Sequence, residues 1–340
     1  MTISLCMIVK DEEKVLGRCL DSLSDLVDEM IIVDTGSKDA TKRIAAGYTD
    51  KIYDFKWVDD FSKARNFAFE KAGCDYIYSA DADEYIDEKN REKFKKLKEA
   101  LLPEVEIVQM YYANQLEQGS LYNFDRELRA KLFKRVRSFT WVDPVHEHIR
   151  ELPLVYDSDI EIKHMPLGNH TKRDLDIFAK SVKKGIKLSK RLNHMYAKEL
   201  MIGGRDEDIL RAEEYFTWLC EDEETDGESL KDAVCLVVRG ALLRNDSEKM
   251  YHYALKEVAM EPASEVCYFL GKYYYQKKNI KEAIIWFYNA AFETESALDI
   301  RYNGEYPFDM LKECYKKLGN EELALDYEKR LKALKDDQKL

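Results

Sequence analysis

The first 81 residues alternate between short apolar runs and segments in which apolar residues recur at helical spacing. This alternation limits the fold more than any other feature, because strands separated by helices form a parallel sheet with helices on its faces. Strands are predicted at 3–9, 29–34, 50–55 and 74–81, and helices at 13–26, from 37 onward and at 61–72. The sequence therefore predicts an α/β fold for the beginning of the chain.

The pattern changes after residue 104. Segments 104–115, 128–135, 138–149 and 159–165 have β-like composition with irregular connections, and we expect them to form an antiparallel extension of the same sheet. From about residue 171 the strand signals stop and helical patterns continue to the end. The prediction is an α/β domain over 1–170 followed by an all-α domain over 171–340.

The second half contains a pattern typical of helical repeats. Segment 269–291 has residues at the spacings of a tetratricopeptide helix pair: Leu270, Gly271, Tyr274, Ala283, Phe287 and Ala290. Two further segments match the pattern in part, at Ala212, Phe216 and Leu219, and at Leu311, Tyr315 and Ala324. A helical-repeat domain is expected, and a plain helical bundle is the alternative.

The charge balance excludes several partners. The chain carries 54 basic and 66 acidic residues, a formal net charge of −12, whereas nucleic acids and anionic membranes need a basic surface.

The seven cysteines include no CxxC pair, which indicates reduced thiols. No stretch is long and apolar enough to span a bilayer, and no signal peptide is seen. We expect a cytoplasmic protein, with peripheral membrane binding as an option.

Two groups of acidic residues follow predicted strands, where open α/β sheets bind ligands. Asp34 ends the second strand and can accept hydrogen bonds from a ligand, or it can cap the helix that follows. Asp81 and Asp83 follow the fourth strand and share one face of an extended backbone. Two carboxylates in one cleft favour a divalent cation such as Mg²⁺, and a solvated acidic loop is the alternative. Glu84 and Asp87 are expected to be solvated residues at a helix start.

Further candidates lie outside these strand ends. Arg65, near the start of a predicted helix, can pair with a phosphate or with Asp81, or form a surface salt bridge of little energetic weight. Segment 139–149 places Trp141 as a stacking surface for a sugar ring or base, and Asp143 and Glu147 as candidate general bases. Polar residues on a strand edge are the alternative. His164 can complete a carboxylate metal site, or it can be structural.

These segments together resemble the family 2 glycosyltransferases, which have the GT-A fold. The resemblance runs through SLCMIVKDEEKVLGRCLDSL, VDEMIIVDTGSKDAT, DKIYDFKWVDDFSKARNFAF, DYIYSADADE, LRAKLFKR and WVDPVHEHI, about half of the chain. The most similar subgroup contains bacterial lipopolysaccharide-core β-1,4-glucosyltransferases and peptide S-glycosyltransferases of the glycocin pathway. Members often carry tetratricopeptide-like C-terminal helices.

The resemblance implies a UDP-sugar donor and a role for each candidate residue. Lys10, Asp11, Glu12 and Asp34 would hold the uridine, and Asp81 would lie by the ribose and phosphates with Arg65 and Trp141 nearby. Asp83 would bind Mn²⁺ or Mg²⁺, with His164 as a second ligand, and Glu147 would be the base, with Asp143 as its competitor. Two residues depart from the family pattern: Asp11 replaces a common Asn, and Asp143 replaces a common Gly.

The expected reaction is therefore metal-dependent, inverting transfer of a hexose, of glucose or N-acetylglucosamine type, from a UDP-sugar. The acceptor is left open, and a peptide or protein side chain is one candidate, since helical repeats form concave surfaces that bind extended peptides. A glycolipid or polysaccharide acceptor is the first alternative, and a non-catalytic helical-repeat scaffold is the second. A nucleotidyltransferase would be expected to show a Gly-rich basic loop where this chain has KDEEK. A homodimer through the helical domain is one option for assembly.

Overall fold

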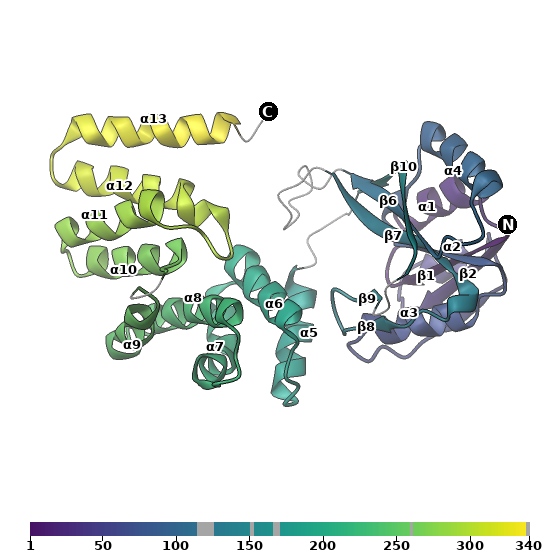
Figure 1. Cartoon of the computed structure of the whole chain (residues 1–340), viewed down its shortest axis with the longest axis horizontal. Helices are drawn as coiled ribbons and strands as arrows, with labels where there is room; N and C mark the ends of the chain where they lie inside the picture. Colours follow the sequence, from purple (N-terminus) through teal and green to yellow (C-terminus); the bar gives the residue numbers. More distant parts are fainter. Residues whose placement is uncertain (114–125, 150–152, 166–170, 259–260, 338–340) are drawn as a thin grey trace. The chain divides into compact units, whose positions relative to one another are not determined.

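The computed structural model describes residues 1–113, 126–149, 153–165, 171–258 and 261–337. The chain divides into two compact units, Met1–His170 and Thr171–Leu340. The first unit contains a β-sheet with helices, and the second is built from helices (Figure 1). Among the described residues, no helix is both long and apolar enough to cross a membrane.

The first unit begins with the predicted strand–helix alternation. Strands β1 and β2 pair in parallel, β1 also pairs in parallel with β4, and β3 continues the sheet beyond β2. The predicted α/β class is confirmed. The elements are β1 (Ile3–Val9), α1 (Leu16–Leu23), β2 (Glu29–Asp34), α2 (Thr41–Ala45), β3 (Ile52–Asp54), α3 (Phe61–Glu70) and β4 (Tyr76–Ala80).

The sheet is then extended by strands of mixed direction. Its order is β3-β2-β1-β4-β7-β6-β10-β5, with β7 antiparallel to both β4 and β6. Strand β10 runs parallel to β6, so the extension is not purely antiparallel. The chain passes through β7, β8 and β9 between β6 and β10. This long connection permits parallel pairing of β6 and β10, because only a tight hairpin forces antiparallel pairing. The elements are β5 (Glu84–Tyr85), α4 (Glu88–Ala100), β6 (Ile107–Ala113), β7 (Arg126–Lys134), η1 (Arg135–Arg137) and β10 (Val155–His164); β8 (Trp141–Val142) and β9 (His148–Ile149) form a separate two-stranded ribbon.

The sheet has an apolar core on each face. One core joins alternate residues of β1 and β4 to α1 and α4, and includes Leu16, Leu20 and Phe94. The other joins the opposite face to α3 and the β8 strand, and includes Phe69 and Trp141. Burial on both faces explains why β1 and β4 are almost continuously apolar rather than alternating.

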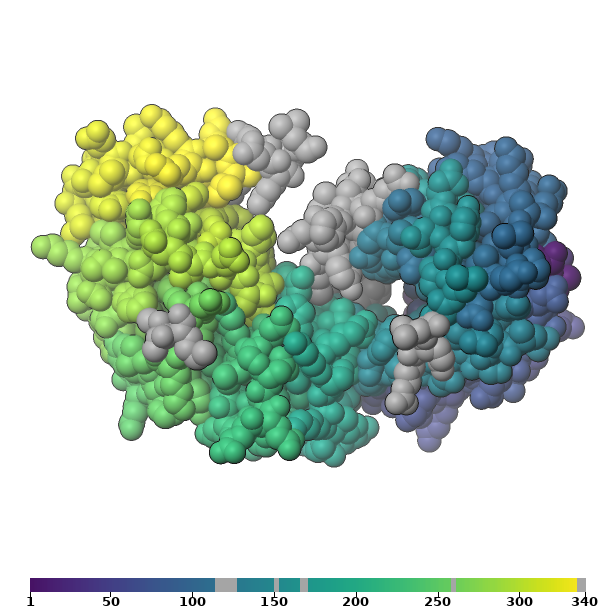
Figure 2. Space-filling model, viewed as in Figure 1, coloured from purple at the N-terminus to yellow at the C-terminus, as the bar shows by residue number. Residues whose placement is uncertain are grey.

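The second unit is a succession of helices. Helices α7 and α8, α10 and α11, and α12 and α13 pack as neighbouring pairs, and α8 also packs against α9 and α10. In the space-filling view the colours of this unit pass in order from teal to yellow, as expected when each pair packs on the next (Figure 2). The elements are α5 (Thr171–Lys183), α6 (Lys190–Gly203), α7 (Asp206–Glu221), α8 (Gly227–Leu243), α9 (Ser247–Val258), α10 (Ser264–Gln276), α11 (Ile280–Tyr288), η2 (Asn289–Glu293), η3 (Ile300–Asn303), α12 (Glu305–Lys317) and α13 (Glu321–Asp337).

The helix pair expected within 269–291 is α10 and α11. A Cβ atom added to Gly271 would lie 2.7 Å from the ring of Phe287, so glycine is needed for the close approach of the two helices. Leu270, Ala283 and Phe287 are fully buried between neighbouring helices. The all-α helical region that the sequence predicts is therefore present.

Candidate active site

Three chain segments with polar side chains leave the sheet at the same edge. Strands β2, β1 and β4 are parallel neighbours, so their carboxyl ends lie side by side. These ends are followed by Lys10–Glu12, by the turn from Asp34 to Ser37, and by Asp81–Asp83. The edge is the place where open α/β sheets bind ligands.

Asp34 has one engaged and one unengaged carboxylate oxygen. Its side chain is buried, with 2% exposure. Oδ1 accepts hydrogen bonds from the backbone N–H groups of Gly36, at 2.9 Å, and Ser37, at 3.0 Å. Oδ2 is buried and has no hydrogen-bond partner among the described residues. Asp34 therefore caps the turn and retains an acceptor whose burial is costly until a donor reaches it.

The turn after β1 is held against the turn after β2. Asp11 adopts a left-handed backbone, with φ of 57°, which Asp tolerates better than most residues. Its carboxylate accepts from the Lys38 N–H at 2.7 Å, and its own N–H donates to the Ser37 hydroxyl at 3.0 Å. The Glu12 N–H donates to the Thr41 hydroxyl at 2.7 Å. Lys10 is exposed beside these bonds.

Arg65 links the acidic strand end to the segment that contains Glu147. Its guanidinium donates to Glu147 at 2.5 Å, to Asp81 at 2.9 Å and to the Ser79 hydroxyl at 3.0 Å. It also lies 5.1 Å from the centre of the Trp141 ring, within cation–π distance. The side chain of Arg65 is only 13% exposed. Its ion pairs with Asp81 and Glu147 therefore form a largely buried junction and not a surface salt bridge.

The charges of this junction are fixed by their neighbours. Burial alone would raise the pKa of Asp81, but Arg65 and Lys131 hold it well below its usual range. Burial likewise opposes the charge on Arg65, but Asp81 and Glu147 raise its pKa above the usual range. Asp81 therefore stays an anion and Arg65 a cation across the physiological pH range.

Asp83 faces His164 across the sheet edge. The Asp83 Oδ2 and His164 Nε2 atoms are 3.2 Å apart, and the imidazole packs against Tyr112 with ring centres 4.8 Å apart. His164 Nδ1 is buried without a hydrogen-bond partner among the described residues. A carboxylate oxygen and an imidazole nitrogen at this spacing fit a divalent metal that takes its other ligands from water and phosphate. The described part of the chain contains no cluster of three or more His, Cys, Asp or Glu side chains suited to a metal.

The expectation that Glu84 is solvated is wrong. Its side chain is 2% exposed and lies 2.5 Å from Lys131, which is also buried. Strand β5 pairs with β10 and turns Glu84 inward, a long-range pairing that the local sequence does not reveal. Burial, Asp81 and Asp83 raise the pKa of Glu84, although Lys131 lowers it. Asp87, by contrast, caps the start of α4 by accepting from the Asn90 N–H at 3.0 Å.

The loop between β8 and β9 turns sharply. Asp143 has φ of 75° and His146 has φ of 50°, so both residues adopt a left-handed backbone, which glycine accepts most easily. The Asp143 Oδ2 atom lies 3.2 Å from His148 Nδ1. Glu147 turns the other way, to Arg65. The two candidate bases therefore have different partners.

Trp141 is a core residue in this structure. It is 9% exposed and packs against Phe69 and Phe133, with ring centres 5.8 Å and 5.4 Å away. The ring packs in the apolar core on one side, and Arg65 lies over it. The expectation of an open stacking surface is thus not met. The Asn66 side chain holds the backbone of Trp141 through two hydrogen bonds. Its amide nitrogen donates to the Trp141 carbonyl oxygen at 2.9 Å, and its amide oxygen accepts from the Trp141 N–H at 2.8 Å.

Sequence reasoning gave no site role to Ser79, Asn66 or Lys131. Ser79 and Asn66 position Arg65 and the β8 strand, and Lys131 neutralises Glu84. The one available signal was that Asn66 adjoins Arg65 at the start of a helix with an apolar face. Lys131 gave no signal, because a lysine in a strand is ordinarily at the surface.

The chain is similar to known glycosyltransferases. Residues 4–147 match the model of Glycosyl transferase family 2. A TPR repeat-containing protein of Synechococcus elongatus is 51% identical over 84 residues, which are 25% of this chain and 21% of that protein. The SPbeta prophage-derived glycosyltransferase SunS of Bacillus subtilis is 37% identical over 102 residues, 29% of this chain and 24% of that protein. The matches thus span a quarter or less of the length of both relatives.

Among solved structures, a glucosyl-3-phosphoglycerate synthase from Mycobacterium tuberculosis superposes with a TM-score of 0.39 and 15% identity. The superposition covers 55% of this chain and 80% of that one, which was solved in complex with Mn²⁺ and UDP-glucose. The family match and the observed sheet together define the N-terminal unit as a GT-A-like domain of glycosyltransferase family 2.

Proposed function

We propose that the chain is a metal-dependent, inverting glycosyltransferase that moves a hexose from a UDP-sugar to an acceptor. The observation that carries the proposal is the convergence, at one sheet edge, of Asp81, Asp83, His164 and Glu147; Arg65 joins Asp81 to Glu147, and Asp83 contacts His164. The four come from segments up to 83 positions apart, and a non-catalytic scaffold has no need to gather them. The family match supports the same conclusion.

The donor would be held by the strand ends. Asp34 offers the buried Oδ2 as an acceptor for an N–H of the uracil, with Lys10 and Glu12 beside it. Asp81 would lie by the ribose and phosphates, and Asp83 with His164 would hold Mn²⁺ or Mg²⁺. The bound metal would stabilise the negative charge that grows on the UDP leaving group.

Glu147 is the proposed base. Its carboxylate would take the proton of the acceptor hydroxyl or thiol as that atom attacks the anomeric carbon, and the bond to UDP would break. Arg65 orients the Glu147 carboxylate and keeps it at a fixed distance from Asp81. Asp143 is the competing base; its contact is with His148 instead.

The two compact units suggest that transfer and acceptor binding belong to different domains. We propose a transferase domain over residues 1–170 and a tetratricopeptide-like domain over 171–340 that binds a peptide or protein acceptor. Successive helix pairs such as α7–α8 and α10–α11 form the kind of surface that holds extended peptides. A glycolipid or polysaccharide acceptor is the alternative.

The test is release of UDP from a panel of UDP-sugars in the presence of Mn²⁺, with and without a chelator. We expect release with at least one UDP-sugar, loss of release with the chelator, and loss in Asp83→Ala. Asp50→Ala is the matched control, because Asp50 is exposed in the turn before β3. If no sugar nucleotide is bound or turned over, the proposal is withdrawn in favour of a scaffold.

A further inference from the structure

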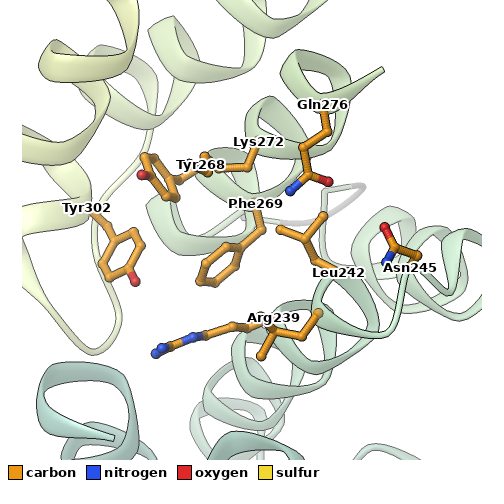
Figure 3. A pocket seen from close by; sticks show the side chains of 9 residues that line it. Arg239, Leu242, Asn245, Tyr268, Phe269, Lys272, Gln276 and Tyr302 are labelled. Atoms are coloured by element: carbon orange, nitrogen blue, oxygen red, sulfur yellow. The ribbon is translucent and has the colours of Figure 1, made fainter. Parts of the chain in front are cut away.

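The helical unit contains a pocket that the proposed reaction does not use. Its volume is about 560 Å³, and it lies between α8 and α10, with Tyr302 of η3 at one side (Figure 3). This volume is within the range of pockets that bind small ligands. Helices α8 and α10 come from successive packed pairs and contact each other, so the pocket lies where one pair packs on the next.

The charged side chains that line the pocket are all cationic. They are Arg239 and Lys272, and no Asp or Glu lines it, although the whole chain has a net charge of −12. The ammonium group of Lys272 forms no hydrogen bond or ion pair with any residue that the structure describes. A cationic lining in an acidic protein favours an anionic ligand.

Arg239 has donor capacity to spare. Its guanidinium lies 3.4 Å from the carbonyl oxygens of Leu200 and Met201 and 3.5 Å from that of Gly204, which are long contacts. The exposed carboxylate of Asp206 is 3.5 Å away. A guanidinium has five N–H donors, so these contacts leave it able to bind a further acceptor. Figure 3 shows its end directed past Phe269 toward the side of Tyr302.

Part of the remaining wall of the pocket is aromatic. The ring centres of Phe269 and Tyr302 are 5.4 Å apart, and those of Tyr268 and Tyr302 are 5.1 Å apart. Burial raises the pKa of both tyrosine hydroxyls above the usual range, despite the nearby Arg239, so both remain neutral. The wall thus offers apolar surface with O–H donors at its edge. The amide side chains of Asn245 and Gln276 also line the pocket and can pair with a peptide backbone.

We propose that this pocket binds an acidic side chain, Asp or Glu, of an extended peptide, with an apolar neighbour of that residue against the aromatic wall. Arg239 and Lys272 would hold the carboxylate. A free phosphate would use the cations but leave the aromatic wall without a partner, and a neutral sugar would leave the cations without one. That the bound peptide is the glycosyl acceptor rests on the proposed function; the binding itself does not.

The test is retention of peptides by the full-length chain. The probes are pools of heptapeptides with blocked termini, random except for one fixed central residue. We expect pools with fixed Asp or Glu to be retained about tenfold more than pools with Asn or Gln, the factor that 1.4 kcal/mol gives. Lys272→Glu should abolish this preference, because it places a like charge beside the ligand.

Lys281→Glu is the matched control, since Lys281 is exposed on α11 and does not line the pocket. It makes the same change of net charge and should keep the preference. Equal retention of acidic and amide pools, or a preference that survives Lys272→Glu, would overturn the proposal. Binding of inorganic phosphate with equal retention of the pools would also overturn it, and would assign the pocket to a phosphate group. Preferential retention of acidic peptides without turnover of any UDP-sugar would contradict the transferase proposal alone. Turnover of a UDP-sugar without preferential retention of acidic peptides would contradict the peptide-binding proposal alone.

Discussion

Arg65 is the residue on which the candidate site depends most. A buried guanidinium is stable only when its donors are satisfied, and Arg65 meets this need with Asp81, Glu147 and Ser79 together. Loss of either Asp81 or Glu147 would leave the guanidinium with a single carboxylate partner. The same three bonds place the proposed base and the nucleotide-side carboxylate in one rigid group. A charge that stabilises the fold here also sets the geometry of the site.

The choice between Glu147 and Asp143 as base can be tested by isosteric substitution. Glu147→Gln keeps the side-chain length but removes the proton acceptor, so we expect transfer to fall by a factor of about 100 or more. Binding of UDP with Mn²⁺ should survive, because Glu147 is not among the proposed donor ligands. Asp143→Asn is the matched comparison and should retain most of the transfer. Activity in Glu147→Gln together with loss in Asp143→Asn would assign the base to Asp143.

At the scale of elements, α10 and α11 approach each other closely at Gly271. The position of Gly271 decides their separation, because any Cβ atom there meets the Phe287 ring. Phe287 is fully buried in the core cluster of this region, which also contains Leu311 and Tyr327 of the next pair. The ring therefore has little room to move away.

Gly271→Ala should destabilise the helical unit by about 1–3 kcal/mol, the usual cost of overpacking. In an open helix the same change would be favourable, because alanine is the better helix former. Gly227→Ala is the control, since a Cβ atom at Gly227 would meet nothing within 4 Å. Urea unfolding followed by circular dichroism measures both variants. Similar effects of the two changes would show that the α10–α11 contact is looser than the structure indicates.

Helix α6 carries a carboxyl group that makes stability depend on pH. Burial and the nearby Asp174 raise the pKa of Glu199 from 4.5 to about 8, and the side chain is 3% exposed. Between these two values the folded chain holds a proton that the unfolded chain has lost. The free energy of unfolding therefore falls as pH rises through this window, by up to about 1.4 kcal/mol per pH unit.

Glu199→Gln removes this titration. We expect the stability of the variant relative to the natural chain to increase progressively from pH 5 to pH 8. Above pH 8 there should be no further gain, since Glu199 is then ionised in both the folded and the unfolded chain. Glu214→Gln, at an exposed position on α7, should show no such trend. Urea unfolding at several pH values gives the comparison. A difference between Glu199→Gln and the natural chain that stays constant with pH would contradict the assigned burial.

At the scale of the whole molecule, the chain consists of two compact units with different architectures. The proposed donor site lies entirely in the first unit, and the cationic pocket lies entirely in the second. A ligand that binds only the folded form of one unit stabilises that unit, by about 2.7 kcal/mol at one hundred times its dissociation constant. The two sites can therefore be examined separately in the intact chain.

Hydrogen exchange of the full-length chain should locate the donor. We expect UDP with Mn²⁺ to slow amide exchange at the ends of β2 and β4, near Asp34 and Asp81, and to leave α10 and α11 unchanged. Asp83→Ala should weaken the effect at the same ligand concentration. Slower exchange confined to the helical unit would place the nucleotide elsewhere and contradict the proposed donor site.

Much of this organisation was predictable because it depends on local patterns. The period of apolar residues predicted β1 to β4 and α3 within a few residues, and the loss of strand signals near residue 170 predicted where helices take over. Parallel strands bring their carboxyl ends together, so the location of Asp34, Asp81 and Asp83 at one edge also followed from the sequence.

Tertiary structure alone decided the contacts between distant segments. Arg65 and Glu147 are 82 positions apart, and neither residue carries a local sign of the other. The burial of Glu84 against Lys131, the packing of Trp141 in the core and the parallel direction of β10 have the same origin. Local periodicity determines which residues form strands and helices, but the pairing of charges inside the molecule depends on strand order and on which faces meet.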